Sequence, residues 1–356
     1  MSLIETKSRA LLFRIGGLGD LLVAFPSMSL ARRSLPGFSL TLVGRQEYGG
    51  LLEHCGVVDE VISFEHPRLA AVFGAKAPDA SATGRLAEFG LAMGWLNRRG
   101  EWPADSWWTK QGVKQAFFTS FESGAAEPIS SIFFDRTYAF FSSFPAARAN
   151  AGPNVGRKTQ KSSLNLGVRN DSPDLVSSDP GQLFDECSRL ALPARLRKKA
   201  LDDLRLRELH KGEKRLVVHP GSGGRAKRWP LPRFMEVIRR AASRGVAGVV
   251  VTGEAEADLE ATLRELELPQ GWVRAARLPA ETLAGLLAES SHYLGNDSGP
   301  THLAAACGVP VLALFREDGL PAWRPFGKTR VLAAASMAEI PLDDVLMALE
   351  EIGAVS

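Results

Sequence analysis

The stretch ALLFRIGGLGD (residues 10–20) decides the fold, because it joins an apolar run to a glycine turn that opens a helix. ALLFRI (residues 10–15) is a continuous apolar segment broken only by Arg14, as in strands buried on both faces of a parallel sheet. Gly16, Gly17 and Gly19 form the predicted turn, and the chain is expected to be helical from Asp20 to about Ser34.

The residues that follow continue the alternation of strands and helices. Pro26 should kink or restart the first helix, because proline lacks the N–H that a helix interior requires. SLTLVG (residues 39–44) and VDEVISF (residues 58–64) are predicted strands, separated by the helix-like EYGGLLEHCG (residues 47–56). This βαβαβ pattern is typical of one half of a doubly wound parallel sheet.

A second region of the same kind begins at residue 183. We expect domains at residues 1–182 and 183–356, with the polar, breaker-rich residues 150–182 as a long loop or linker. In the less regular middle, strands are expected at 90–97 and 114–120 and a helix at 130–142. Strands of the second domain are predicted within 214–219, 246–253, 272–275, 291–295 and 309–315, the last of them ending the sheet. Its helices are predicted at 183–191, 194–209, 231–243, 255–266, 280–290 and 301–308.

Composition excludes several classes of protein. At 356 residues with 45% hydrophobic and 23% charged residues, the chain suits two globular domains. The net charge of +3 is too small to indicate a nucleic-acid binder. The three cysteines are far apart without metal-ligand spacing, which favours free thiols in a reducing compartment. The sequence shows no His/Cys zinc cluster and no Asp-x-Asp motif beside a strand, which favours a reaction without a metal.

The sequence lacks recognisable targeting signals, so we expect a cytoplasmic protein. The first ten residues lack the apolar core of a signal peptide, and no run reaches the roughly 18 apolar residues that a membrane helix needs. The basic stretches RLRKK (residues 195–199) and GRKTQK (residues 156–161) leave open a peripheral contact with an anionic membrane surface. The alternative is a solvated helix face or loop.

The first glycine turn carries one acid, Asp20. Gly17 and Gly19 fit the start of a dinucleotide fingerprint, but Leu22 stands where its third glycine would be, which disfavours a dehydrogenase. Asp20 has two interpretations: it caps the helix by accepting backbone N–H groups, or it faces a substrate as a base. A helix N-terminus weakens a carboxylate as a base but keeps it ionised at neutral pH.

A second turn is HPGSGGRAKRWP (residues 219–230), which is not a Walker A loop because no Gly-Lys-Ser/Thr follows. Its amide-rich segment around Ser222, followed by Lys227 and Arg228, suits a phosphate or pyrophosphate. The alternative is a solvated basic loop in which Trp229 and Pro230 pack.

A third turn, GNDSGPTHLAAACG (residues 295–308), leads from a strand into a helix. The N–H groups of residues 298–302, with Pro300 in the first helical turn, would form an anion site. Asp297 or Ser298 could instead cap the helix, and His302 could be a buried structural histidine. After another strand, Glu254 and Glu256 are candidates to bind a ribose, or are solvated acids at a helix start.

In this order the three turns resemble glycosyltransferase family 9, the ADP-heptose:lipopolysaccharide heptosyltransferases. The resemblance rests on RIGGLGDLLVAFPSMSLARRSLPG, VVHPGSGGRAKRWPLPRF and NDSGPTHLAAACGVPVLALF, and covers residues 10–64 and 214–330. It implies a GT-B fold, in which two doubly wound Rossmann-like domains face each other across a cleft. The N-terminal domain would bind a lipid-linked glycan acceptor, and the C-terminal domain the ADP-sugar.

The resemblance also implies the chemistry. The family inverts the anomeric carbon, so a base deprotonates the acceptor hydroxyl, which displaces ADP in lipopolysaccharide biosynthesis. No cofactor is implied beyond the ADP-sugar substrate. Asp20 would be the base and Lys227, with Arg228 beside it, the pyrophosphate ligand. The remaining donor contacts implied or suggested are Ser222, Glu254, Glu256, Asp297, Ser298, Gly299, Thr301 and His302.

Other functions stay open from sequence alone. A GT-B transferase or epimerase using another nucleotide sugar would share these motifs. A binding protein without acceptor chemistry would share them too, although Asp20 in its glycine turn argues against that.

Overall fold

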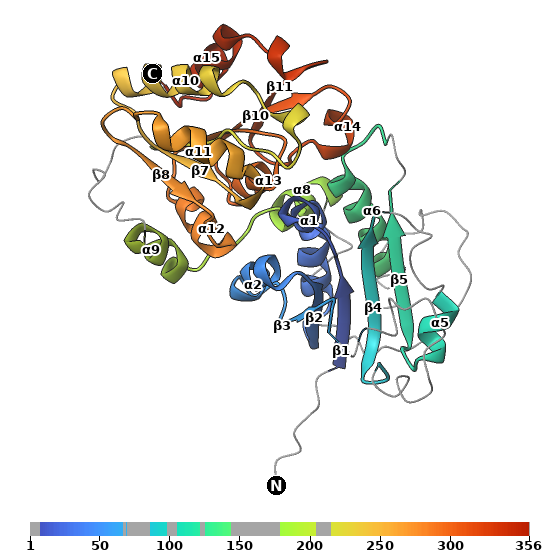
Figure 1. The fold of residues 1–356 in the computed structure, drawn as a ribbon. Coiled ribbons are helices and arrows are strands. Elements are labelled where there is room, and N and C mark those ends of the chain that lie inside the picture. Colours follow the sequence, from blue (N-terminus) through green and yellow to red (C-terminus); the bar gives the residue numbers. More distant parts are fainter. Residues whose placement is uncertain are drawn as a thin grey trace. The chain divides into compact units, whose positions relative to one another are not determined.

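The computed structural model describes residues 8–66, 69, 86–97, 105–121, 125–143, 179–203 and 215–355. Its contacts divide the chain into two units (Figure 1). The first comprises residues 1–16, 24–125 and 129–187, and the second comprises residues 17–23, 126–128 and 188–356. The expected division after residue 182 falls inside a helix. Most of the expected linker and the stretch 156–161 lie outside the described residues.

The described residues of the first unit form five parallel strands in the order β3-β2-β1-β4-β5. The chain reverses its direction of travel across the sheet between β1 and β4, as in doubly wound sheets. The strands are β1 (Ser8–Phe13), β2 (Phe38–Gly44), β3 (Glu60–Ser63), β4 (Phe89–Leu96) and β5 (Gln115–Ser120).

Helices and aromatic side chains complete the first unit. The rings of Phe13, Trp108 and Phe118 contact one another in a buried cluster. The helices are α1 (Leu18–Ser34), α2 (Gln46–His54), α5 (Asp105–Lys110), α6 (Ile129–Ser142) and α8 (Pro180–Cys187). The first residues of α1 pack with the second unit, whereas the rest belongs to the first.

In the second unit, the part of the chain that the structure describes forms six parallel strands in the order β11-β10-β9-β6-β7-β8. Its point of reversal lies between β6 and β9, which pair with His219 opposite Gly295. The strands are β6 (Arg215–His219), β7 (Ala247–Thr252), β8 (Trp272–Ala276), β9 (His292–Asn296), β10 (Val311–Arg316) and β11 (Thr329–Ala334).

The helices of this unit fall into two packed groups. α10 contacts α15, whereas α12 contacts α9 and α13. The longer helices are α9 (Ala194–Asp203), α10 (Leu231–Ser243), α11 (Ala257–Glu265), α12 (Ala280–Ala288), α13 (Gly299–Ala306) and α15 (Leu342–Glu351). The short ones are η4 (Arg225–Lys227), η5 (Glu254–Glu256), α14 (Leu320–Trp323) and η6 (Met337–Glu339).

The structure confirms two parallel-sheet α/β domains and corrects several details. The predicted strands at 90–97 and 114–120 and the helix at 130–142 are present as β4, β5 and α6. The first helix begins at Leu18 rather than Asp20 and neither ends nor restarts at Pro26. Its neighbours from Leu21 to Met28 are buried, so packing offsets the missing hydrogen bond. The strand at 309–315 is not the last, because β11 follows it at the sheet edge.

Candidate active site

The candidate site lies where β6 and β9 end. These two strands are neighbours at the reversal point of the second sheet, the position at which open α/β sheets bind their ligands. The loop of residues 220–230 follows β6, and residues 297–298 lead from β9 into α13. Two of the three turns singled out from the sequence therefore meet in space.

Asn296, the last residue of β9, holds the loop that follows β6. Its side chain is fully buried, and its Nδ2 donates to the carbonyl oxygens of Pro220 and Gly221 at 2.9 and 3.1 Å. Its Oδ1 accepts the backbone N–H of Trp229 at 3.0 Å. One amide thus fixes both ends of the loop.

Lys227 and Asp297 form an ion pair at the centre of the site. Lys227 Nζ lies 2.7 Å from Asp297 Oδ2, and the Asp297 side chain is only 8% exposed. Ser222 Oγ donates to the backbone oxygen of Asp297 at 2.7 Å, which joins the loop to the end of β9 a second time. The structure therefore brings together three of the predicted donor ligands.

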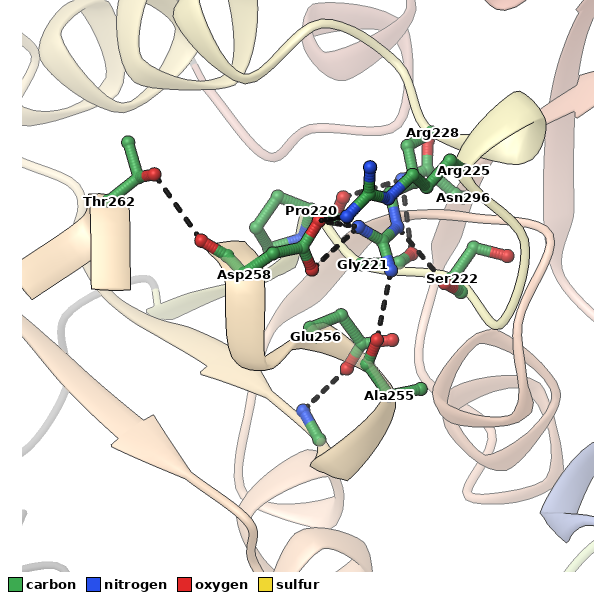
Figure 2. Close-up of polar contacts among 11 residues, drawn as sticks. Pro220, Gly221, Ser222, Arg225, Arg228, Ala255, Glu256, Asp258, Thr262 and Asn296 are labelled. Carbon is green, nitrogen blue, oxygen red and sulfur yellow. Dashed lines mark hydrogen bonds and ion pairs between the residues drawn. The ribbon is translucent and has the colours of Figure 1, made fainter. Parts of the chain in front are cut away.

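Arg228 points away from this pair. Its Nη1 lies 3.0 Å from both carboxylate oxygens of Asp258, and its Nη2 donates to Ala255 O at 3.0 Å (Figure 2). Its Nε donates to Ser222 O at 3.1 Å. These bonds hold the pKa of Asp258 below its usual range, and they occupy all three nitrogens of the guanidinium. A pyrophosphate contact of Arg228 stays a prediction.

The start of α13 carries the remaining residues of the third turn. Ser298 is at the N-cap position without a capping side-chain bond, and its Oγ lies 3.2 Å from Thr301 Oγ1. Thr301 Oγ1 also donates to Asn296 O and lies 3.1 Å from the hydroxyl of Tyr293. Thr301 is therefore buried in a network beneath the turn.

His302 is buried near the carboxylates of Asp297 and Asp20. Burial lowers its pKa to about 4, against the opposing effect of Asp297 and Asp20. Within the described part of the chain neither ring nitrogen has a hydrogen-bond partner, and the ring lies edge-on to Trp323. The neutral imidazole is thus the form present at neutral pH.

The glycine turn packs on the same helix start, since residues 17–23 belong to the second unit. A Cβ on Gly299 would lie 2.9 Å from Leu18 Cβ and 3.1 Å from Gly19 N, so this approach requires glycine. Asp20 Oδ2 accepts the N–H of Gly17 at 3.0 Å, so Asp20 does cap the helix, from its third residue rather than from the N-cap.

Glu254 and Glu256, the two acids after β7, differ in their exposure to solvent. Glu254 is exposed, whereas Glu256 is buried, and its Oε2 accepts the N–H of Gly253 at 2.6 Å. A Cβ on Gly221 would lie 2.4 Å from the Glu256 carboxyl carbon, so the loop passes directly over this side chain. Ribose binding by either acid stays a prediction.

Sequence reasoning missed Asn296 and Asp258. Asn296 has a weak signal in the sequence, because it is a polar residue ending an apolar strand next to Asp297. Asp258 has none, because it resembles any acid in the first turn of a helix. Among the described residues, no group of three His, Cys, Asp or Glu side chains could hold a metal ion.

The sequence is similar to known glycosyltransferases. Residues 180–341 match the family model described as glycosyltransferase family 9 (heptosyltransferase). The chain is 26% identical over 347 residues to lipopolysaccharide heptosyltransferase 1 of Pseudomonas aeruginosa, covering 91% of this chain and 82% of that protein. Residues 180–341 thus carry the sequence pattern of glycosyltransferase family 9.

Two further comparisons concern a relative that matches over part of its length and a solved structure that matches over nearly the whole chain. Lipopolysaccharide heptosyltransferase 3 of Escherichia coli is 28% identical over 138 residues, covering 37% of this chain and 40% of that protein. The crystal structure of a family 9 glycosyltransferase from Veillonella parvula matches with a TM-score of 0.68 at 15% identity, covering 97% of each chain. This shared architecture confirms the expected GT-B fold.

Proposed function

We propose that the protein is an inverting glycosyltransferase that moves a heptose from ADP-heptose to a lipopolysaccharide core or related glycan acceptor. The match of residues 180–341 to family 9 supports glycosyl transfer, and the names of the heptosyltransferase relatives support heptose as the sugar. The observation that carries the proposal is the meeting of the loop after β6, the Lys227–Asp297 pair and the Asp20 turn around the start of α13.

The donor would bind through charges and amides already in place. Lys227 is 43% exposed, so its ammonium can leave Asp297 in part and contact a pyrophosphate. Asp297 would then accept hydrogen bonds from the sugar hydroxyls. The N–H groups at the start of α13 add positive potential for the phosphates.

Transfer would be a single displacement at the anomeric carbon. The acceptor oxygen forms the new bond to that carbon while the bond to the ADP oxygen breaks, and ADP leaves with the electron pair. Asp20 takes the proton of the acceptor hydroxyl. Lys227 and the loop amides stabilise the negative charge that develops on ADP.

The partners of this function would be the nucleotide sugar and a lipid-linked glycan. The basic helix α9 is the described candidate for a peripheral contact with an anionic membrane surface. In α9, Lys199 forms an ion pair with Asp203, and Arg197 lies 3.6 Å from Glu289. This pairing favours a solvated helix face over a lipid-binding one. Among the described helices, none is long and apolar enough to cross a bilayer.

Calorimetry with ADP, UDP, GDP, CDP and NAD tests the donor class first, followed by turnover with ADP-heptose and a deacylated core glycan. Preference for ADP and transfer of heptose would support the proposal. Preference for UDP or GDP would overturn the heptose donor but retain nucleotide-sugar chemistry. Release of an epimerised sugar without an acceptor would indicate an epimerase, and absence of any nucleotide binding would overturn the proposal as a whole.

A further inference from the structure

Three consecutive carbonyl groups of the loop after β6 are bound by the side chains of Asn296 and Arg228. Pro220 O and Gly221 O accept from Asn296 Nδ2, and Ser222 O accepts from Arg228 Nε (Figure 2). The N–H of Trp229 fixes which end of the Asn296 amide faces these carbonyls, because only an oxygen can accept it. The direction of each of the three peptide planes is therefore set by a side chain.

Fixing a carbonyl also fixes the amide of the next residue. In a trans peptide the C=O of one residue and the N–H of the following residue point in opposite directions, and no described peptide bond is cis. The N–H groups of Gly221, Ser222 and Gly223 therefore point away from Asn296 and Arg228. Within the described residues, none of these three N–H groups donates to another part of the chain.

Consecutive amides with this common direction form the kind of concavity that binds anions. The loop can adopt it because Gly221 lets the backbone pass over Glu256, whose carboxylate is already occupied by the N–H of Gly253. Asn296 is fully buried and the Arg228 side chain is only 11% exposed, so both act from behind the loop.

Arg228 is itself held rigidly, which distinguishes it from its neighbour Arg225. The Asp258 carboxylate and Ala255 O fix the guanidinium so that Nε faces Ser222 O. Arg225 lies 3.2 Å from the same Asp258, but its side chain is 81% exposed and it binds no loop carbonyl. Arg225 and Arg228 therefore carry the same charge, lie on the same loop and pair with the same acid, Asp258. Of these two arginines, only Arg228 binds a carbonyl of the loop.

We propose that Asn296 and Arg228 are positioning residues, which bind the carbonyls of residues 220–222 and so present the N–H groups of residues 221–223 to the donor pyrophosphate. This inference rests on the proposed function, in which the loop binds the phosphates of the nucleotide sugar. Neither side chain needs to touch the donor.

The test compares Arg228→Gln and Asn296→Asp with the matched control Arg225→Gln. In Asn296→Asp a carboxylate oxygen would face two carbonyl oxygens, whereas the N–H of Trp229 keeps its acceptor. Calorimetry measures the affinity of each variant for ADP and for adenosine, which lacks the phosphates. We expect both loop variants to bind ADP about tenfold more weakly, equal to about 1.4 kcal/mol. Adenosine affinity should not change, and Arg225→Gln should bind both ligands as the wild type does.

Three outcomes would overturn the positioning role. These are unchanged ADP affinity in both loop variants, equal weakening in Arg225→Gln, and equal weakening of ADP and adenosine. The first would mean that the loop amides are not used, the second a simple loss of charge, and the third general damage to the site.

A second measurement separates this inference from the proposed function. Spectra of ligand-free protein labelled with ¹⁵N-glycine report the amides of Gly221 and Gly223 directly. We expect these two signals to move in Arg228→Gln and Asn296→Asp but not in Arg225→Gln. If the wild type bound no nucleotide, the proposed function would fail, and these spectra would still decide whether the two side chains set the loop. Unmoved signals would overturn that.

Discussion

Asp20 shows how one side chain can satisfy both interpretations that the sequence allows. Its carboxylate accepts the N–H of Gly17, which is a capping bond from the third helical residue. The same carboxylate is close enough to His302 to oppose the lowering of that pKa by burial. Capping explains why the acid is tolerated at the turn, and a carboxylate that accepts such a bond can still accept a proton.

The substitution Asp20→Asn separates these two roles. Asparagine keeps an oxygen that can accept the N–H of Gly17, but it loses the charge and the basicity. We expect transfer to slow by about 10²- to 10⁴-fold with an unchanged melting temperature and unchanged ADP affinity. Turnover of ADP-heptose, thermal unfolding and calorimetry check this, and wild-type turnover in the variant would exclude Asp20 as the base.

Lys227 is the cation that faces the site in the free protein. Its Nζ is 2.7 Å from Asp297 Oδ2, and the neighbouring Arg228 points elsewhere. For Lys227→Ala we expect ADP affinity to fall at least about tenfold, with a smaller effect on adenosine. Arg225→Gln is the matched control, because it removes one positive charge from the same loop. If calorimetry gave the two variants equal ADP affinities, a direct phosphate contact of Lys227 would be wrong.

The residues of the site could be predicted from sequence where a motif carries them. Asp20, Lys227, Asp297, Thr301 and His302 lie in the three turns, and the structure brings them together. The residues that hold these side chains and loops in place, such as Asn296 and Asp258, could not be predicted in the same way. Asp258 acts through an arginine 30 positions earlier, a pairing that depends on how two loops fold over one sheet.

At the scale of elements, α12 packs against α9 through a glycine. A Cβ on Gly285 would lie 2.6 Å from Ala200 Cβ and 2.7 Å from Leu196 O, so the two helices are in close backbone contact. Alanine in a helix interior is normally about 0.5–1 kcal/mol more favourable than glycine. At position 285 an alanine would force the backbone of α9 to move. The cost of this steric clash outweighs the helix preference of alanine over glycine.

We therefore expect Gly285→Ala to destabilise the protein by about 1–3 kcal/mol, because overpacking forces backbone shifts. Gly37→Ala is the control, since a Cβ at this position would have no other atom within 4 Å and the φ of Gly37 is not positive. Thermal unfolding of both variants measures the effect. A higher melting temperature for Gly285→Ala would mean that α9 does not pack on α12 as described.

Elements with strong local patterns were predictable, and weakly patterned ones were not. The six residues of β7 are all buried, and their apolar run predicted the strand. β11 is only half-buried at the sheet edge. Its short apolar run VLAA (residues 331–334) suits a helix as well as a strand, and the strand was not predicted. Pro26 was expected to kink or restart α1. The helix continues through it without a restart, because its flanking residues are buried, and a kink stays a prediction.

At the scale of the whole molecule, the sequence indicated two parallel sheets but not the order of their strands. That order places β6 beside β9, and so brings residues about 75 positions apart within hydrogen-bond distance, such as Ser222 and Asp297. Strand order follows from the packing of helices on both faces of a sheet, which no local pattern contains. The site is therefore a property of the topology, although its motifs are local.

Two buried histidines make the stability of the molecule depend on pH. Burial lowers the pKa of both His219 and His302, in His302 to about 4. The unfolded chain binds these protons near pH 6.5, so below that pH both histidines hold more protons in the unfolded chain than in the native state, for His302 down to about pH 4. The stability that these two groups contribute is therefore fully present above about pH 6.5 and falls as the pH decreases below that value.

Melting temperatures from pH 5 to 7.5 test this in the wild type and in His302→Gln, which does not titrate. We expect the wild type to lose stability more steeply below pH 6.5 than the variant, which retains only the effect of His219. Acids with lowered pKa values, such as Asp258, do not interfere, because their contribution is lost mainly below about pH 4. Parallel curves for the two proteins would mean that His302 takes up its proton in the native state as readily as in the unfolded chain.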